Sequence, residues 1–535
     1  MTSKRMTPDQ AKRLSIAEQH DWFRRATSRR SLLRGGVISA GVLAAAPALL
    51  GGSAGAAVGS PAKRTPMLLA SADVPNGAGV PAFGRHIAFG ADPTSQMAVA
   101  WQVPALVKSP FLRVGLSPFD LSGPIPAEIR TLTTPVSDTV PVDSVSINAP
   151  SQDVQYYLHA QVDGLRAGQT YFYSIGHQGR DALNVVGTFT TAPHGRVPFT
   201  VTALGDHGVT YDAIATNNLI NAYCPAFHLH AGDVSYAESG GSGLITDTYD
   251  PRIWDIFFTE MDGIAGHIPW QLAVGNHELE AWYSPDGYGG QYARWDFPGQ
   301  VTSSKPPTYY SWIYGNVGFL SLDANDVSFE IPADLGYTGG AQTAWLKTTL
   351  ASLRSNPQVD FIVAYFHHCA YSTCTVHGCE GGVQKHWTPL FDQYSVDLVI
   401  NGHNHVFERT DPIINGSSTG AAPIGATIYP AKDGTTYVCA GAGGESLYSF
   451  SAPDSYEGAI HNVSSEATFV NEYDFATKTS YTVSETVTWS RIRYTGYNLL
   501  VVDSTPGSGP NSRSTLLVRG LDEYGAELDR FTLVR

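Results

Sequence analysis

The sequence predicts a multidomain α+β protein in which an N-terminal β-sandwich precedes a larger α/β domain. The chain has 535 residues, which is too long for one ordinary hydrophobic core. Residues 81–193 contain short stretches of alternating polar and apolar residues, which are typical of antiparallel strands. From residue 199 onward, near-continuous apolar runs, typical of strands buried on both faces, lead directly into short polar motifs.

The segment from residue 81 to residue 193 is expected to form a β-sandwich of the fibronectin type III kind. Its alternating runs are Met97 to Trp101, Tyr156 to Val162, Thr170 to Ile175 and Thr188 to Thr191. Leu165 followed by Tyr171 resembles a tyrosine corner, in which a tyrosine hydroxyl bonds back to the preceding loop. No cluster of catalytic residue types lies here, so this domain is expected to act as a scaffold or to shape a substrate cleft.

The first 56 residues are expected to be a twin-arginine signal peptide. Arg29 and Arg30 precede a modestly apolar stretch from Gly35 to Leu50, and Ala54-Gly55-Ala56 offers a small-residue cleavage site. A membrane anchor is the alternative, but this run is shorter than the ~20 residues that a spanning helix needs. We therefore expect an exported protein that is secreted, periplasmic or associated with the cell envelope, with no stable membrane span after cleavage. Residues 57–80 are rich in Pro, Gly and Ala and are expected to be a linker.

The composition limits the possible partners. The formal net charge is −15, which argues against a nucleic acid as partner. A net negative charge also disfavours phosphate anions, unless bound cations outweigh the surface carboxylates locally. The sequence does not indicate an oligomeric state.

Five cysteines are present, and an odd number leaves at least one unpaired within a monomer. Cys369, Cys374 and Cys379 are spaced C-x4-C-x4-C, while Cys224 and Cys439 lie apart. In an exported protein we expect a disulfide that fixes a loop, with a soft-metal site as the less favoured alternative. Which cysteines would pair is not determined by the sequence.

Five polar motifs follow predicted strands, where α/β sheets place their ligand sites. They are Gly205-Asp206-His207-Gly208, Gly232-Asp233-Val234-Ser235-Tyr236, Gly275-Asn276-His277-Glu278, His367-His368 and Gly402-His403-Asn404-His405. Phosphoester hydrolysis needs a nucleophilic oxygen and positive charge on the phosphoryl group, and two cations at about 3.5–4 Å supply both. The motifs therefore predict a two-metal phosphoesterase site.

The residue types suggest individual roles at this site. Asp206 is expected to be a terminal carboxylate ligand, Asp233 a bridging one and Asn276 a neutral ligand. Imidazole ligands are expected from His367, with His368 as an alternative, and from His403 and His405, whose spacing on an extended segment puts both rings on one side. Tyr236 adds a phenolate oxygen, which favours ferric iron. The histidines expected to lie outside the ligand set are His207, His228 and His230.

In combination, these motifs resemble those of the purple acid phosphatases, a branch of the calcineurin-like metallophosphoesterases. The wider family usually opens with Asp-x-His, whose histidine binds a metal, but position 208 is Gly here. Purple acid phosphatases show the same loss and use the tyrosine of Gly-Asp-x-x-Tyr, which Tyr236 matches. The resemblance extends from about residue 80 to the C-terminus, apart from a polar insertion near residues 445–485. It implies that residues 194–535 form a metallophosphoesterase αββα sandwich.

The resemblance also implies a metal centre and a reaction. Ferric iron would be held by Asp206, Tyr236 and His405, a divalent iron, zinc or manganese ion by Asn276, His367 and His403, and both by Asp233. His277 matches a histidine that contacts phosphate. His377 matches one that can protonate the leaving group, although Val376 replaces the histidine that usually precedes it.

The implied activity is that of an acid phosphatase, which hydrolyses phosphate monoesters by attack of a metal-bound hydroxide. The first alternative is a phosphodiesterase or phospholipase-type hydrolase of the same superfamily. A more distant one is a cell-envelope binding protein with a catalytically dead domain.

Overall fold

The structure is a computed structural model that describes most of the chain beyond the predicted leader. The described residues are 79–135, 152–181, 186–244, 247, 249–280, 287–298, 308–462, 465–509 and 512–535, with Arg13, Leu14, Gln19 and Trp22. The predicted signal peptide and linker, including Arg29 and Arg30, lie almost entirely outside these residues. Over the part of the chain that is described, no helix combines the length and apolar character needed to cross a membrane.

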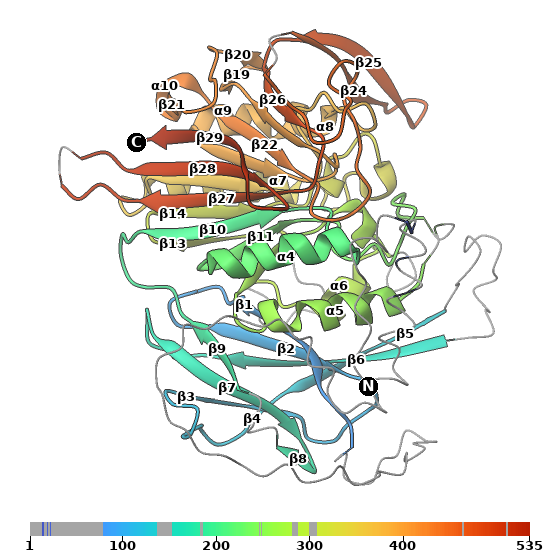
Figure 1. Cartoon of the computed structure of the whole chain (residues 1–535), viewed down its shortest axis with the longest axis vertical. Coiled ribbons are helices and arrows are strands. Elements are labelled where there is room, and N and C mark those ends of the chain that lie inside the picture. The colour runs from blue at the N-terminus through green and yellow to red at the C-terminus, as the bar shows by residue number, and fades with distance from the viewer. Residues whose placement is uncertain are drawn as a thin grey trace.

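Two antiparallel sheets form the N-terminal domain, in the lower part of Figure 1. One contains β1 (Phe83–Phe89), β2 (Met97–Val103), β6 (Gln152–Val162) and β5 (Glu128–Pro135), in that order. The other contains β4 (Ile125–Pro126), β3 (Phe111–Gly115), β7 (Thr170–His177) and β8 (Arg180–Asp181), with β9 (Gly187–Thr190) paired to β7. The Tyr171 hydroxyl accepts a 2.9 Å hydrogen bond from the Arg166 backbone N–H, as a tyrosine corner requires. The predicted β-sandwich is confirmed.

Two larger mixed sheets form the second domain, in the upper part of Figure 1. The seven-stranded sheet has the order β12 (Trp270–Ala273), β11 (Phe227–Ala231), β10 (Phe199–Leu204), β27 (Asn498–Thr505), β28 (Thr515–Asp522), β29 (Glu527–Val534) and β21 (Ala426–Ile428). The eight-stranded sheet has the order β13 (Tyr310–Tyr314), β14 (Val317–Ser321), β15 (Phe361–Tyr365), β17 (Leu398–Asn401), β22 (Thr436–Ala440), β18 (Phe407–Thr410), β26 (Ser490–Tyr494) and β23 (Ile460–Asn462). Strands β10 to β12 run parallel, as do β14, β15, β17 and β22. The apolar runs of β11, β15 and β17 are buried throughout, as expected for strands covered on both faces.

Helices cover the outer faces of both sheets. Helices α4 (Tyr211–Tyr223), α5 (Arg252–Ala265) and α6 (Gly289–Arg294) lie on the side of the seven-stranded sheet that faces the sandwich (Figure 1). Helices α7 (Ala341–Ser355), α8 (Gly381–His386) and α9 (Thr388–Tyr394) pack in a common core with β14, β15 and β17. Shorter helices are α10 (Pro430–Asp433), η2 (Asn276–Glu278), η3 (Ala324–Asp326) and η4 (Pro332–Asp334). The layers are helix, sheet, sheet and helix, which confirms the predicted αββα architecture.

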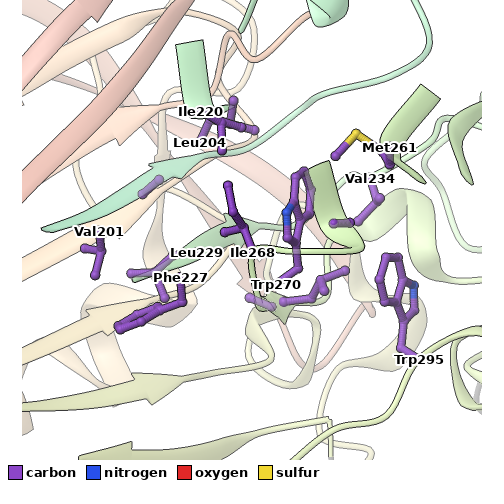
Figure 2. Packing of buried hydrophobic residues seen from close by; sticks show 14 of the residues in the cluster. Val201, Leu204, Ile220, Phe227, Leu229, Val234, Met261, Ile268, Trp270 and Trp295 are labelled. Carbon is purple, nitrogen blue, oxygen red and sulfur yellow. The ribbon is translucent and has the colours of Figure 1, made fainter. Parts of the chain in front are cut away.

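Local sequence explains where the main helices begin and what they bury. Helix α4 begins after Thr210, whose hydroxyl accepts a 3.1 Å hydrogen bond from the Ala213 N–H, and ends at Cys224 in the left-handed conformation. Helix α7 buries Leu346, Leu350 and Leu353, which recur every three or four residues along one face. Figure 2 shows how Trp270 of β12 packs among apolar side chains of β10, β11, α4 and α5.

The sandwich is bonded to the helices that support the seven-stranded sheet. Arg85 of β1 forms an ion pair of 2.7 Å with Asp262 of α5, and the Tyr173 hydroxyl donates to the Gly266 carbonyl at 2.6 Å. His159 of β6 bonds to Asp296, just beyond α6, at 2.7 Å. One hydrophobic cluster also runs through both domains. The two domains therefore share a packed interface, consistent with a scaffolding role for the sandwich.

The polar insertion folds into a hairpin that the sequence did not predict. Strands β24 (Glu466–Asp474) and β25 (Thr479–Val487) pair antiparallel, and β24 adds to β16 (Cys379–Glu380). A second small hairpin joins β19 (Ile413–Ile414) to β20 (Ser417–Ser418). The β24–β25 hairpin thereby reaches the loop that carries His377.

All five cysteines are free thiols in the structure, so the disulfide expected from the sequence is not formed there. The Cys369 and Cys439 thiols both donate to the Gly402 carbonyl oxygen, at 3.1 and 3.5 Å. Cys224 is exposed at the end of α4, away from the buried group of four. The thiols of Cys369, Cys379 and Cys439 donate to backbone carbonyls, and all four buried cysteines pack as small apolar groups.

One buried ion pair joins the two large sheets and gives a stability prediction. Arg409 of β18 bonds to both Asp529 carboxylate oxygens on β29, at 2.5 and 3.1 Å, and both side chains are buried. Arg409→Met should lower the free energy of unfolding by about 3–5 kcal/mol, because it leaves Asp529 buried without a partner. Chemical denaturation would measure this change.

The control for this prediction lies on β29, the strand that carries Asp529. Arg530 pairs with Glu527 at 3.5 Å, with both side chains more than a third exposed. Arg530→Met should change stability by less than about 0.5 kcal/mol. Equal effects of the two substitutions would contradict the argument.

Candidate metal centre

The predicted ligands lie in loops that follow β10, β11, β12, β15 and β17, at the carboxyl ends of these strands. Four of them have a left-handed backbone: Asp206 (φ 57°), Asp233 (φ 54°), Tyr236 (φ 57°) and His403 (φ 68°). Within the described ranges, only nine residues other than glycine have a positive φ, so ligands make up nearly half of them. Such strained conformations are costly and concentrate at functional sites.

The motif glycines let these loops approach one another closely. A Cβ atom at Gly402 would lie 2.5 Å from Asp206 Oδ2, and one at Gly275 would lie 2.1 Å from Asp233 Oδ1. Gly232 has a φ of +87° and would place a Cβ atom 2.8 Å from His367 Nδ1. A side chain at any of these positions would displace a predicted ligand.

Asp206, Tyr236 and His405 form the first group of ligand atoms. The Tyr236 hydroxyl lies 3.0 Å from Asp206 Oδ1 and 2.8 Å from His405 Nε2. His405 Nε2 lies 3.2 Å from the same Asp206 oxygen. His405 Nδ1 is bonded to the Ser446 carbonyl at 2.5 Å, which directs Nε2 into the group.

The electrostatics of this first group call for a cation. Burial raises the pKa of Tyr236 well above its ordinary value, and the carboxylates of Asp206 and Asp233 raise it further. The phenol therefore ionises here only if a bound cation compensates the charge. A phenolate, a carboxylate and an imidazole together form a hard oxygen and nitrogen donor set suited to such an ion.

Asp233, His367 and His403 form the second group. His367 Nε2 lies 3.0 Å from Asp233 Oδ2 and 3.2 Å from His403 Nδ1. The other His367 nitrogen bonds to the Ala231 carbonyl at 2.8 Å, which fixes the ring orientation. These three residues place one donor atom each within 4.8 Å of one another, as binding of a metal ion requires.

Asn276 supplies an independent sign that a cation belongs at this site. Its Nδ2 donates to the Gly241 carbonyl at 3.0 Å, while its buried Oδ1 has no hydrogen-bond partner among the described residues. A buried acceptor without a partner is costly unless a ligand satisfies it. The two groups adjoin, since His367 Nε2 lies 4.0 Å from Asp206 Oδ1. The residues present therefore suit a pair of metal ions.

Glu278 holds two of the ligand loops together. Its carboxylate accepts hydrogen bonds from the backbone N–H groups of Asp233 (2.7 Å), Val234 (2.8 Å) and Gly275 (2.7 Å). Glu278 is buried, so these N–H groups have no access to water as a substitute. The loops after β11 and β12 are thus fixed relative to each other.

His277 lies beside both groups. Its ring centroid is 4.4 Å from that of Tyr236, its Nδ1 donates to the Glu238 carbonyl at 2.6 Å, and its backbone N–H donates to Asp233 Oδ1 at 2.9 Å. Burial lowers the pKa of His277, but the carboxylates of Asp233 and Glu238 outweigh burial and raise it to about 10. Without the opposing charge of bound metal ions, these carboxylates therefore favour the protonated His277 ring.

His377 lies on the other side of the site, against His403. The two rings stack with centroids 3.9 Å apart and planes inclined by 30°. His377 Nδ1 bonds to Glu330 at 2.6 Å. The nearby Glu380 carboxylate accepts hydrogen bonds from Ser328, Phe329, Glu330 and Gly382.

The other histidines lie where the sequence placed them, outside the two groups. Both His207 nitrogens are bonded elsewhere, to the Gly208 carbonyl and to Asn217. His228 and His230 are buried beside Trp270. Of the adjacent pair after β15, His367 points at Asp233, while His368 packs against the His403 ring at 4.4 Å.

Several residues around the site had no predicted role. Glu238 and Glu278 lie in or beside the motifs, so a search for buried carboxylates near the ligands could have found them. Glu330, Asn471 and Tyr448 come from segments without any local signal. Tyr448 stacks on His405, with centroids 4.0 Å apart and planes inclined by 7°.

Comparisons with known proteins identify both domains. Residues 83–191 match the family described as purple acid phosphatase, N-terminal domain, and residues 199–407 match calcineurin-like phosphoesterase. An uncharacterised protein of Mycobacterium tuberculosis is 28% identical over 490 residues, which is 85% of this chain and 87% of that protein. Purple acid phosphatase 15 of Arabidopsis thaliana is 28% identical over 284 residues, about half of each chain (50% and 52%).

A solved structure shares the fold. The purple acid phosphatase PPD1 from yellow lupin (Lupinus luteus) seeds superposes with a TM-score of 0.61 at 19% identity, covering 86% of this chain and 75% of that one. The fold and the clustered ligands define a metal-dependent phosphoester hydrolase. The chain belongs to the purple acid phosphatase family of calcineurin-like phosphoesterases, a family that implies a binuclear metal centre.

Proposed function

We propose that this protein is an exported acid phosphatase that hydrolyses phosphate monoesters with a centre of ferric iron and a divalent iron, zinc or manganese ion. The observation that carries the proposal is the position of Tyr236, whose hydroxyl lies 3.0 Å from Asp206 and 2.8 Å from His405. A phenolate in this group favours a ferric ion over a divalent one.

We assign one metal ion to each of the two groups of ligand atoms described above. The ferric ion would be held by Asp206, Tyr236 and His405, and the divalent ion by Asn276, His367 and His403, with Asp233 bridging. When bound, the metal pair would supply a nucleophilic oxygen and positive charge for the phosphoryl group.

Side chains of the protein would bind the phosphoryl group of the substrate and protonate its leaving group. His277, which lies beside both groups, would contact a phosphoryl oxygen. His377 would deliver a proton from Nε2 to the departing oxygen, since its Nδ1 is occupied by Glu330. The left-handed backbone at four ligands and the Glu278 bonds would keep the site formed before substrate arrives.

Export by the twin-arginine route is part of the proposal. It rests on Arg29, Arg30 and the apolar run that follows. This route carries folded proteins, so the metals would be acquired before export. Replacing both arginines with lysine should retain the protein in the cytoplasm, and unchanged export would contradict this part of the proposal.

The function is tested on the purified full chain by metal analysis, a visible spectrum and kinetics. We expect two metals per chain, at least one of them iron, and a visible absorption band. We expect p-nitrophenyl phosphate to be hydrolysed with a higher kcat/KM than bis(p-nitrophenyl) phosphate. A preference for the diester would favour the phosphodiesterase alternative, and less than one metal per chain would favour the binding protein.

A further inference from the structure

Glu330 lies between the two histidines that stack at the edge of the metal centre. Its Oε1 accepts a 2.6 Å hydrogen bond from His377 Nδ1, and its Oε2 accepts a 3.0 Å hydrogen bond from His403 Nε2. One carboxylate therefore contacts both a candidate metal ligand and the candidate proton donor. No local sequence signal marks this residue, which lies 73 positions before His403 in the chain.

Three separate segments hold Glu330, one through its carboxylate and two through the backbone of residues 329 and 330. Asn471 of β24 donates to Glu330 Oε2 at 3.3 Å and to the His377 carbonyl at 2.6 Å, so one amide contacts both residues. The Glu330 backbone N–H donates to Glu380 of β16 at 3.2 Å. The Ser480 hydroxyl of β25 donates to the Phe329 carbonyl. The hairpin of β24 and β25 thus forms part of the site.

These contacts determine which nitrogen of His377 can act. With Nδ1–H bonded to Glu330, Nε2 is the ring nitrogen left to exchange a proton, and Nε2 has no partner among the described residues. The ring lies flat against His403 and is about one-fifth exposed, so Nε2 remains accessible. His403, bonded through Nε2, is left with Nδ1 facing His367.

We infer that Glu330, held by Asn471, is a positioning residue that fixes His377 for proton transfer to the leaving group and orients His403 toward the divalent ion. The inference rests on the proposed function and adds a residue, and an inserted hairpin, to it. Carboxylates that bond to metal-ligating histidines typically change metal affinity or activity by 10- to 100-fold when removed.

The first test compares leaving groups in the metal-saturated full chain. Glu330→Gln should lower kcat for phenyl phosphate by roughly 10- to 100-fold, because its poor leaving group needs a proton. It should lower kcat for dinitrophenyl phosphate less than about threefold, because that leaving group departs as a stable anion. Glu485→Gln, an exposed carboxylate on β25, is the matched control and should behave as wild type on both substrates.

The second test does not depend on activity. Competition with a chelator should show that Glu330→Gln binds the divalent ion roughly tenfold more weakly, because His403 loses its Nε2 partner. Asn471→Ala keeps the Glu330 charge and should change both readouts in the same direction by a smaller factor. It serves as the second variant should Glu330→Gln fold poorly.

A double substitution separates positioning from general damage. In a His377→Gln background, Glu330→Gln should lower kcat for phenyl phosphate by less than about threefold more, because the two residues act as one unit. Equal losses on both leaving groups, or fully additive losses in this background, would overturn the inference. A wild-type protein without phosphatase activity would overturn the proposed function instead, and the chelator test would still report on the contact between Glu330 and His403.

Discussion

Asp233→Asn is expected to lower kcat/KM for a phosphate monoester by about a thousand-fold or more, which corresponds to about 4 kcal/mol of transition-state stabilisation. Asp233 Oδ1 accepts from the His277 N–H at 2.9 Å, and Oδ2 faces His367 Nε2 at 3.0 Å. The substitution removes the negative charge shared by the two groups of ligands and puts an N–H where an anionic oxygen should be. We therefore also expect fewer than two metals per chain, measured by elemental analysis.

The control for this prediction is Asp503→Asn. Asp503 lies on β27 opposite Thr200, at the end of β10 remote from Asp206, and pairs with Arg519 at 2.7 Å on a partly exposed surface. This variant should keep its metals and its rate. An Asp233→Asn protein with two metals and a wild-type rate would exclude Asp233 from the centre.

Tyr236→Phe is expected to abolish the visible absorption band and to lower the ferric iron content. The band would arise from charge transfer between the phenolate and ferric iron, and phenylalanine has no oxygen to donate. The ring would still pack against His277, so the fold should remain. We expect kcat to fall by roughly a hundred-fold, or about 2.7 kcal/mol, measured alongside the spectrum of the oxidised protein.

Tyr448→Phe is the matched comparison within the same site. Tyr448 stacks on His405, but no hydrogen bond joins its hydroxyl to Asp206 or His405 among the described contacts. This variant should keep the band. If Tyr448→Phe lost the band and Tyr236→Phe kept it, the phenolate would be assigned to the wrong tyrosine.

The candidate ligands could be selected from the sequence because each lies in a short motif that is recognisable by itself. Asp206, Asp233 and His367 follow buried apolar strands, and their motifs combine glycine with hard donor atoms. The same signals located the strands, so β10 begins and ends at the predicted residues Phe199 and Leu204. The glycines in these motifs allow neighbouring loops to approach closely, and they can be recognised in each short motif without knowledge of the fold.

The surroundings of the ligands could not be predicted in this way. Glu330 acquires its neighbours only when the loop before η4, the loop of His377 and the β24–β25 hairpin meet in space. Nothing in its own segment distinguishes it from a solvated glutamate. The disulfide was expected because the protein is predicted to be exported. In the structure the Gly402 carbonyl instead accepts hydrogen bonds from two of the thiols.

The distribution of the ligands over two sheets bears on how the protein matures. Asp206, Asp233, Tyr236 and Asn276 follow strands of the seven-stranded sheet, and His367, His403 and His405 follow strands of the eight-stranded one. A folding intermediate in which only one sheet has formed would hold at most about half of the coordination sphere. Tight metal capture would then mark the end of folding, after the sheets have docked, and a chain already loaded with metal would be one whose folding is complete.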